Sequence, residues 1–178
     1  MTVKATPDFA LEIPPGDDKQ RSVCQRCDFI DYQNPKIVAG AVVLKGDKIL
    51  LCQRDIEPRK GFWTLPAGFM ELGESVEEAA KREAQGEALA DIEIDRLLAV
   101  YSVPRIGQVH VMYRAHLKGD FGIGPESQAV KLVDWKDIPW SQLSFPTVVW
   151  ALTHYAETRD QAVFAPFSNP KGTDTLTR

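Results

Sequence analysis

The apolar residues in the middle of the chain fall in short runs bounded by turn residues, which is the pattern of β-strands. The first run is nearly continuous, as expected of a strand that is buried on both faces. Gly46-Asp47 separates the first two runs and predicts a hairpin, and Pro104 and Gly107 mark the turn between the next two. The predicted strands span residues 37–44, 48–52, 92–103, 108–117 and 129–135.

Two further stretches predict helices. The first begins at Ser75, because Ser75 and Glu78 have the spacing of a capping box. Small apolar residues such as Ala80 and Ala84 follow, and they suit close packing of this helix on a sheet. The second helix is predicted over residues 141–155. The succession of strands and helices predicts the α/β fold class, with a mixed β-sheet that carries helices on both faces.

The first predicted helix carries a pair of acidic residues with a defined spacing. Glu83 and Glu87 are four residues apart, so they lie one above the other on one face. Two stacked carboxylates repel each other unless a cation lies between them or water solvates them. Carboxylate oxygens suit hard cations such as Mg²⁺. The pair is therefore either a metal site or part of a solvated acidic face.

Composition and charge narrow the range of partners. The net charge is -4, from 21 basic and 25 acidic residues, whereas proteins that coat nucleic acid are more often basic, so we expect no nucleic-acid partner. No apolar run approaches the roughly 20 residues that cross a bilayer, so we expect no membrane partner. The first residues lack the pattern of a secretory signal. With three Cys residues, a reduced, cytoplasmic protein is expected.

Residues 1–34 differ from the rest of the chain in being turn-rich and polar. Cys24 and Cys27 form a C-x2-C pair, which is half of a zinc ribbon, but a structural zinc ion needs four ligands. We therefore do not expect zinc in a monomer; two chains that share one ion are the alternative. The predicted organisation is a ribbon-like extension over residues 1–34, a main domain over 35–158, and a loose tail over 159–178.

The stretch 68–90 resembles the Nudix box, G-x5-E-x7-R-E-U-x-E-E-x-G-U, where U is apolar. Gly86 and Leu89 stand where the box has Glu and Gly. The matching positions are Gly68, Glu74, Arg82, Glu83, Ala84, Glu87 and Ala90. The run from Gly124 to Ser127 and the residues 138–145 resemble the FAD and ADP-ribose pyrophosphatases, which have Glu at position 129 instead of Ala129. The N-terminal segment resembles a zinc-ribbon extension whose first C-x2-C pair would fall at Thr2 and Ala5.

This resemblance implies a Nudix-type α/β/α sandwich that hydrolyses the pyrophosphate bond of a nucleoside diphosphate derivative, such as FAD or ADP-ribose, with Mg²⁺ or Mn²⁺. Arg82 is expected to orient the glutamates through an ion pair with Glu74, and Glu126 to act as a ligand of a second ion or as a base. The implied catalytic residues are Glu83, Glu87, Arg82 and Glu126, and the implied metal ligands are Gly68, through nearby backbone, Glu83 and Glu87.

The same resemblance predicts which residues contact the substrate and whether the chain forms a dimer. Arg54 is expected to meet substrate phosphates, and Trp63 and Tyr101 are candidate aromatic surfaces for a base, with core packing as the alternative for both. Homodimerisation is expected on the strength of the resemblance alone. Gly86 and Ala129 each remove a carboxylate that relatives have, so the alternative function is a weakly active or non-hydrolysing nucleotide-binding module.

Overall fold

The computed structural model describes residues 8–173, and the chain divides into an N-terminal unit, residues 1–34, and a main unit, residues 35–178. The N-terminal unit is a three-stranded antiparallel sheet of β1 (Phe9–Glu12), β2 (Arg21–Cys24) and β3 (Ile30–Asp31). The Cys24–Cys27 turn is closed by the Asp28 N–H, which donates to Cys24 O at 2.9 Å. Thr2 and Ala5, the positions at which the resemblance places a further C-x2-C pair, lie outside the described residues.

The main unit is built on a mixed sheet in the order β10-β5-β4-β9-β8, with β6 paired to β5 and β7 paired to β4. The parallel pair is β4 with β9, and the other pairs are antiparallel. The predicted hairpin is confirmed, since Leu44 pairs with Ile49. The strands are β4 (Lys36–Lys45), β5 (Lys48–Arg54), β6 (Trp63–Thr64), β7 (Ala67–Phe69), β8 (Asp91–Val103), β9 (Gln108–Lys118) and β10 (Ser127–Val133).

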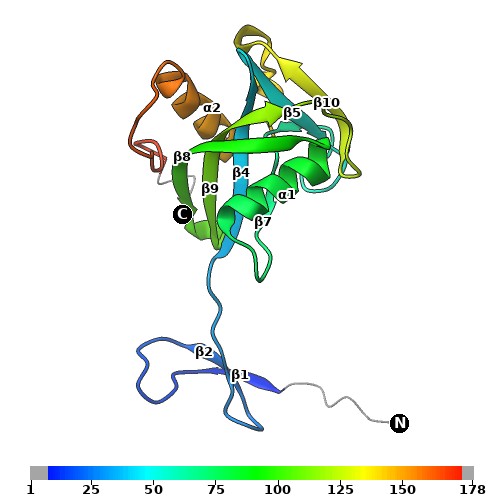
Figure 1. Ribbon diagram of the computed structural model, residues 1–178. Helices are drawn as coiled ribbons and strands as arrows, with labels where there is room; N and C mark the ends of the chain where they lie inside the picture. Colours follow the sequence, from blue (N-terminus) through cyan, green and yellow to red (C-terminus); the bar gives the residue numbers. More distant parts are fainter. Residues whose placement is uncertain (1–7, 174–178) are drawn as a thin grey trace, which may run out of the picture. The chain divides into compact units, whose positions relative to one another are not determined.

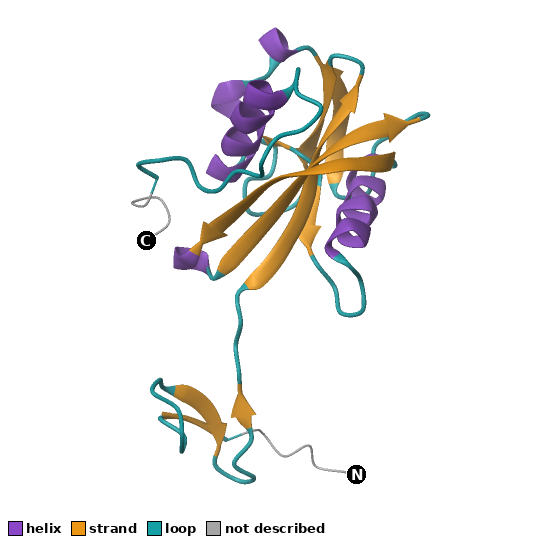
Figure 2. Ribbon diagram, turned by 60° about the vertical axis from the view of Figure 1, so that its left-hand side comes forward, coloured by secondary structure: helices purple, strands orange, loops and turns teal. Residues whose placement is uncertain are grey.

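Two α-helices, α1 (Val76–Ala88) and α2 (Pro146–Thr158), lie on opposite faces of this sheet (Figures 1 and 2). The predicted α/β fold class, with a mixed sheet between helices, is confirmed. The short 3₁₀ helices are η1 (Pro104–Ile106), η2 (Trp135–Asp137) and η3 (Trp140–Gln142). Over residues 8–173, no helix has the length and apolar character needed to cross a membrane.

The second helix starts later than the sequence pattern predicts. It begins at Pro146 and not at residue 141. The residue before a proline is sterically disfavoured in the helical region, and Phe145 is accordingly extended, with φ -137° and ψ 149°. The 3₁₀ turn η3 and an extended segment occupy the residues that were assigned to the helix.

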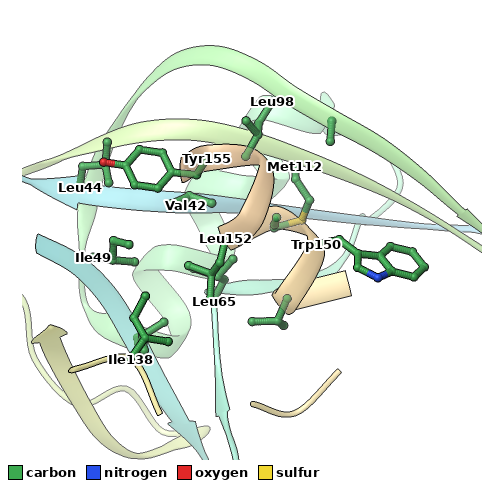
Figure 3. Packing of buried hydrophobic residues seen from close by; sticks show 14 of the residues in the cluster. Val42, Leu44, Ile49, Leu65, Leu98, Met112, Ile138, Trp150, Leu152 and Tyr155 are labelled. Atoms are coloured by element: carbon green, nitrogen blue, oxygen red, sulfur yellow. The ribbon is translucent and has the colours of Figure 1, made fainter. Parts of the chain in front are cut away.

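Each face of the sheet buries its own hydrophobic core. The α2 core lies between the sheet and α2, and the α1 core lies between the sheet and α1. Val42 and Leu44 of β4 point into the α2 core, whereas Ala41 and Val43 point into the α1 core, so β4 is buried on both faces as predicted. Figure 3 shows residues of the α2 core, which include Val42, Leu65, Leu98, Met112, Trp150 and Leu152.

The segment after α2 packs on the main unit, although the sequence predicts a loose tail. The Phe167 N–H donates to Leu98 O, and the Val100 N–H donates to Phe167 O, both at 2.9 Å. The Asn169 side chain accepts from the Ser102 N–H and donates to Ser102 O. β8 is an edge strand with unpaired backbone groups, and the tail satisfies some of them. This edge pairing, together with Phe167 at the α2 core, holds the tail.

Candidate active site

A cavity of about 650 Å³ lies in the main unit. The side chains that line it fall into a charged group and a largely uncharged group on opposite sides of β4. On one side Val38 of β4 pairs with Phe69 of β7, next to α1, and on the other it pairs with His110 of β9. The charged residues of the lining include Arg54, Arg82, Glu83, Glu87 and Glu126, so the structure brings the predicted polar site residues together.

Helix α1 sets the positions of the carboxylates. Its N-terminus has the predicted capping box, in which Ser75 accepts from the Glu78 N–H and Glu78 accepts from the Ser75 N–H. Alanines on the buried side of the helix bring its backbone close to the sheet. As a result Glu87, one turn beyond Glu83, is only 5% exposed, although it is a charged residue type.

Glu87 is buried with little compensation. Within residues 8–173 its carboxylate has one hydrogen bond, a long one of 3.4 Å from the Ala67 N–H to Oε2. Burial, followed by the charge of Glu83, raises the pKa of Glu87 to about 8. A buried carboxylate is stable as an anion only when a partner charge or several hydrogen bonds compensate for lost hydration. Glu87 therefore holds a proton in the metal-free protein at neutral pH.

Gly68 leaves the space that the Glu83 carboxylate occupies. A Cβ atom on Gly68 would lie 2.4 Å from Cδ of Glu83, closer than side-chain atoms approach one another. Gly68 belongs to β7 and lines the cavity, so its backbone lies beside the carboxylate. Burial raises the pKa of Glu83, and the neighbouring Arg82 opposes that rise. Any side chain at position 68 would displace Glu83.

Arg82 ties the loop before α1 to the carboxylate pair. Its Nε and Nη2 donate to the two oxygens of Glu74 at 3.0 and 2.8 Å, and its Nη1 donates to Glu83 Oε1 at 2.6 Å. Nη2 also donates to Phe69 O at 2.8 Å. The predicted Arg82–Glu74 ion pair is confirmed, and the hydrogen bonds from Arg82 lower the pKa of Glu74 to about 2. The bidentate pairing with Glu74 fixes the guanidinium, and the single bond from Nη1 orients the Glu83 carboxylate.

The loop that carries Glu126 is fastened to the C-terminal end of α1. The Gly124 N–H donates to Glu87 O at 3.1 Å. A Cβ atom on Gly124 would lie 1.9 Å from Gly86 O, so only glycine permits this approach. Glu126 thereby reaches the cavity, where its negative charge adds to burial in raising the pKa of Glu83 and of Glu87.

Arg54 is a second basic residue beside these carboxylates, in addition to Arg82. It lines the cavity, and its positive charge partly offsets the rise in the pKa of Glu87 that burial causes. The guanidinium is held by a 2.9 Å hydrogen bond from Nε to Pro58 O and lies over the Phe145 ring, 5.2 Å from its centroid. Its remaining nitrogens are the groups that an anionic substrate would meet.

The two predicted aromatic surfaces do not line the cavity. Tyr101 is fully buried in the α2 core, and its hydroxyl is 2.7 Å from His154 Nδ1. Trp63 is 8% exposed in the same core. The structure favours core packing for both residues. Ala129 also packs against the α2 core and lies outside the cavity lining, whereas Gly86 is exposed and lines the cavity. Glu at position 129 would therefore not join this carboxylate group.

The sequence did not identify the uncharged side of the cavity. Gln108, His110 and Met112 come from β9, and Thr147 and Trp150 come from α2. These elements are far apart in the sequence, and no motif links them.

The charged group fits a divalent cation. Glu87 is buried with one weak partner and stands beside a second, half-buried carboxylate, so a positive ion would remove an unfavourable charge arrangement. Among the residues that the structure describes, no three His, Cys, Asp or Glu side chains converge to hold a metal by themselves. Mg²⁺ typically binds through one or two carboxylates together with substrate phosphates and water. The donor set therefore suits an ion that arrives with a phosphorylated substrate.

Comparisons with known proteins agree with this geometry. A family model described as NUDIX domain matches residues 34–151, and a zinc-ribbon model described as Nudix N-terminal matches residues 6–33. An ADP-ribose pyrophosphatase of Methanocaldococcus jannaschii is 34% identical over 113 residues, which cover 61% of this chain and 67% of that protein. The NAD-capped RNA hydrolase NudC of Photobacterium profundum is 37% identical over 71 residues, 40% of this chain and 26% of that protein.

A solved structure extends the likeness to nearly the whole chain. The crystal structure of a NUDIX hydrolase from Nitrosomonas europaea superposes with a TM-score of 0.86 at 41% sequence identity. The match covers 93% of this chain and 95% of the other.

Proposed function

Since the chain belongs to the Nudix hydrolase family, we propose that it uses Mg²⁺ or Mn²⁺ to hydrolyse the pyrophosphate bond of ADP-ribose or a related dinucleotide such as FAD. Family membership supports hydrolysis, and the archaeal relative named an ADP-ribose pyrophosphatase supports the substrate class. Homodimerisation remains a prediction.

The observation that carries the proposal is the state of Glu87. A carboxylate that is 5% exposed, with a pKa raised to about 8 and one hydrogen bond of 3.4 Å, is unfavourable as a purely structural residue. Strongly perturbed ionisable groups that line a cavity are typical of functional sites. A divalent ion in place of the proton would compensate for the lost hydration, so that Glu87 could be both charged and buried.

The residues of the cavity have separate tasks in this reaction. Glu83, Glu87 and the backbone near Gly68 would hold the ion, and Arg82 fixes the orientation of Glu83. A bound divalent ion neutralises phosphate oxygens and lowers the pKa of coordinated water. Arg54 offers its free guanidinium nitrogens to the substrate phosphates. Glu126 is exposed and can accept the proton of the attacking water.

The test is hydrolysis of ADP-ribose and FAD over a range of Mg²⁺ concentrations by the wild type and by Glu87→Gln. The substitution keeps the shape of the side chain and removes its charge. We expect Mg²⁺-dependent turnover to fall by about two orders of magnitude or more, as for the loss of a major electrostatic stabiliser. Glu77→Gln is the matched control, because Glu77 is exposed on the same helix and does not line the cavity.

Two outcomes would change the assignment. Equal turnover of the wild type and Glu87→Gln would show that Glu87 is not a metal ligand. A wild type that binds nucleotides and hydrolyses none of them would support the non-hydrolysing binding module.

A further inference from the structure

We propose that Asp55 is a positioning residue, which holds Glu126 at the charged side of the cavity by joining the loop after β5 to the start of β10. This inference rests on the proposed function, in which Glu126 accepts the proton of the attacking water. It deepens that function, because it names the contacts that keep the proton acceptor in place. The supporting observations are the charges around Glu126, a bulge in β10 and the partners of Asp55.

Glu126 has to be held because its surroundings repel it. It is exposed, and its negative charge contributes to raising the pKa of both Glu83 and Glu87. Like charges at short range repel one another. The neighbouring Arg82 pairs with Glu74 and Glu83 and therefore does not pair with Glu126. The place of Glu126 in the cavity thus depends on its main chain and on the residues beside it.

The main chain around Glu126 is tied to β5. The turn that presents Glu126 closes with a hydrogen bond of 3.1 Å from the Ser127 N–H to Gly124 O. The carbonyl oxygen of Glu126 accepts from the Asp55 N–H at 2.8 Å. Asp55 is the first residue after β5, so this bond joins the turn to the end of that strand.

A β-bulge at the start of β10 brings a second contact to Asp55. The register with β5 shifts between Ser127 and Ala129, so Gln128 is the extra residue of the bulge. Bulges are common next to active sites, where they redirect side chains. Here the Gln128 side chain donates from Nε2 to Asp55 Oδ1 at 3.0 Å. The bulge therefore links the residue two positions beyond Glu126 to the same aspartate.

The Asp55 side chain has a second partner within its own loop. Lys60 Nζ lies 3.0 Å from Asp55 Oδ1, and the hydrogen bonds from Lys60 and Gln128 lower the pKa of Asp55. Asp55, Lys60 and Gln128, here called the Asp55 clamp, do not line the cavity. The clamp can therefore position Glu126 without contact with the substrate. Its effect should be moderate, because the Asp55 side chain is 43% exposed.

The first experiment compares kcat and KM for ADP-ribose at saturating Mg²⁺. We expect kcat to fall about five- to tenfold in Asp55→Ala and about threefold in Gln128→Leu, as for the loss of two hydrogen bonds or one, with KM changed by less than about twofold. Asp55→Asn keeps an acceptor for Gln128 and should recover most of the loss. Asp134→Ala is the matched control, because Asp134 forms a similarly exposed pair with Lys48 at the other end of the β5–β10 pairing and does not line the cavity.

A double-mutant cycle tests whether the clamp acts through Glu126. Glu126→Gln has already lost the proton acceptor, so adding Asp55→Ala should lower kcat by less than about twofold. An equal loss in both backgrounds would overturn the proposal. An unchanged kcat in Asp55→Ala, a change in KM alone, or an equal loss in Asp134→Ala would do the same.

The second experiment does not depend on turnover. Amide hydrogen exchange, followed by NMR, reports the stability of the Ser127 N–H bond that closes the turn around Glu126. We expect exchange of this amide to be at least about threefold faster in Asp55→Ala and Gln128→Leu, and unchanged in Asp134→Ala. Unchanged exchange in the first two variants would overturn the proposal. A protein that hydrolyses no nucleotide but shows the expected exchange would refute the proposed function and leave the clamp standing.

Discussion

At the scale of single residues, the protonation of Glu87 links metal binding to pH. Its pKa is raised from 4.5 to about 8, mainly by burial. Between those values the metal-free folded protein keeps a proton that the unfolded chain releases. The free energy of unfolding of the metal-free protein therefore falls, through this group, as the pH rises from about 4.5 to about 8. Metal binding must displace the same proton.

We predict that Mg²⁺ affinity in the absence of nucleotide rises with pH below about 8, by up to about tenfold per pH unit, and levels off above it. Calorimetry in buffers of different ionisation enthalpy would measure both the affinity and the released proton. Glu87→Gln should abolish the proton release. An Mg²⁺ affinity that is flat across this pH range in the wild type would contradict the assignment.

A second residue prediction concerns Gly86, which stands where the family has Glu. A Cβ atom there would meet nothing within 4 Å, and the position lines the cavity, so Glu can be accommodated. We expect Gly86→Glu to raise the initial rate at limiting Mg²⁺, because it adds a carboxylate to the group. Gly86→Gln is the control, because it adds no charge but removes the same helix-propensity cost of glycine, which is up to about 1 kcal/mol in both variants. Equal initial rates in Gly86→Glu and the wild type would show that other ligands already compensate for the missing carboxylate at position 86.

At the scale of elements, the end of α1 shows why the family sequence has glycine at position 89. Leu89 adopts the left-handed conformation, with φ 48° and ψ 31°, and its N–H donates to Gln85 O at 3.0 Å. This geometry is the αL motif of helix ends, in which glycine avoids the clash of a Cβ atom. The structure thus retains the turn although the sequence has lost the residue that favours it.

We predict that Leu89→Gly stabilises the protein by about 1 kcal/mol, the typical strain of one left-handed residue. The midpoint of thermal unfolding should rise by about 2–4 °C for a chain of this size. Leu89→Ala is the control, since it removes the side chain and keeps the Cβ atom, and it should show no gain. A midpoint for Leu89→Gly no higher than that of Leu89→Ala would mean that Leu89 is unstrained.

Local signals in the sequence predicted those elements that depend on local physics. The capping box at Ser75 and the turn at Gly46-Asp47 are decided by neighbouring residues, and both were found where expected. The start of α2 was misplaced because Pro146 overrides the helical pattern before it. The spacing of Glu83 and Glu87 predicted the carboxylate pair, and the resemblance to the Nudix box added Arg54, Arg82 and Glu126 to the charged side of the cavity. The uncharged side could not be predicted, since only tertiary pairing brings β9 and α2 to it.

At the scale of the whole molecule, the N-terminal unit keeps the turn of a zinc ribbon without a complete set of thiolates. Cys24 is buried and Cys27 exposed at a closed turn. Residues 1–34 contain no other Cys and no His, and Cys52 is buried in the main unit. The zinc-ribbon model nevertheless matches residues 6–33, which weighs against the expectation of no bound zinc, while the unit itself supplies two of the four thiolates of a complete site.

Elemental analysis of protein purified without a metal-affinity step should give well under one zinc per chain. A Cys24→Ser, Cys27→Ser double variant supplies the background value. Half an equivalent, together with a dimer that the double variant cannot form, would show an ion shared between two chains. One tightly held zinc per chain would refute the prediction.

The parallel pairing of β4 with β9 has a consequence for how the protein is made. The pairing runs from Lys36 with Gln108 to Leu44 with His116, so its partners are more than 70 residues apart. Synthesis at about 5–20 residues per second leaves β4 without this neighbour for several seconds. Contacts of such long range also slow folding itself. Helix α1, which carries Glu83 and Glu87, is synthesised early, but the β4–β9 pairing in the sheet on which it packs can form only after β9 has been synthesised. A chain whose synthesis stops before Gln108 would therefore expose apolar strands to proteases and chaperones.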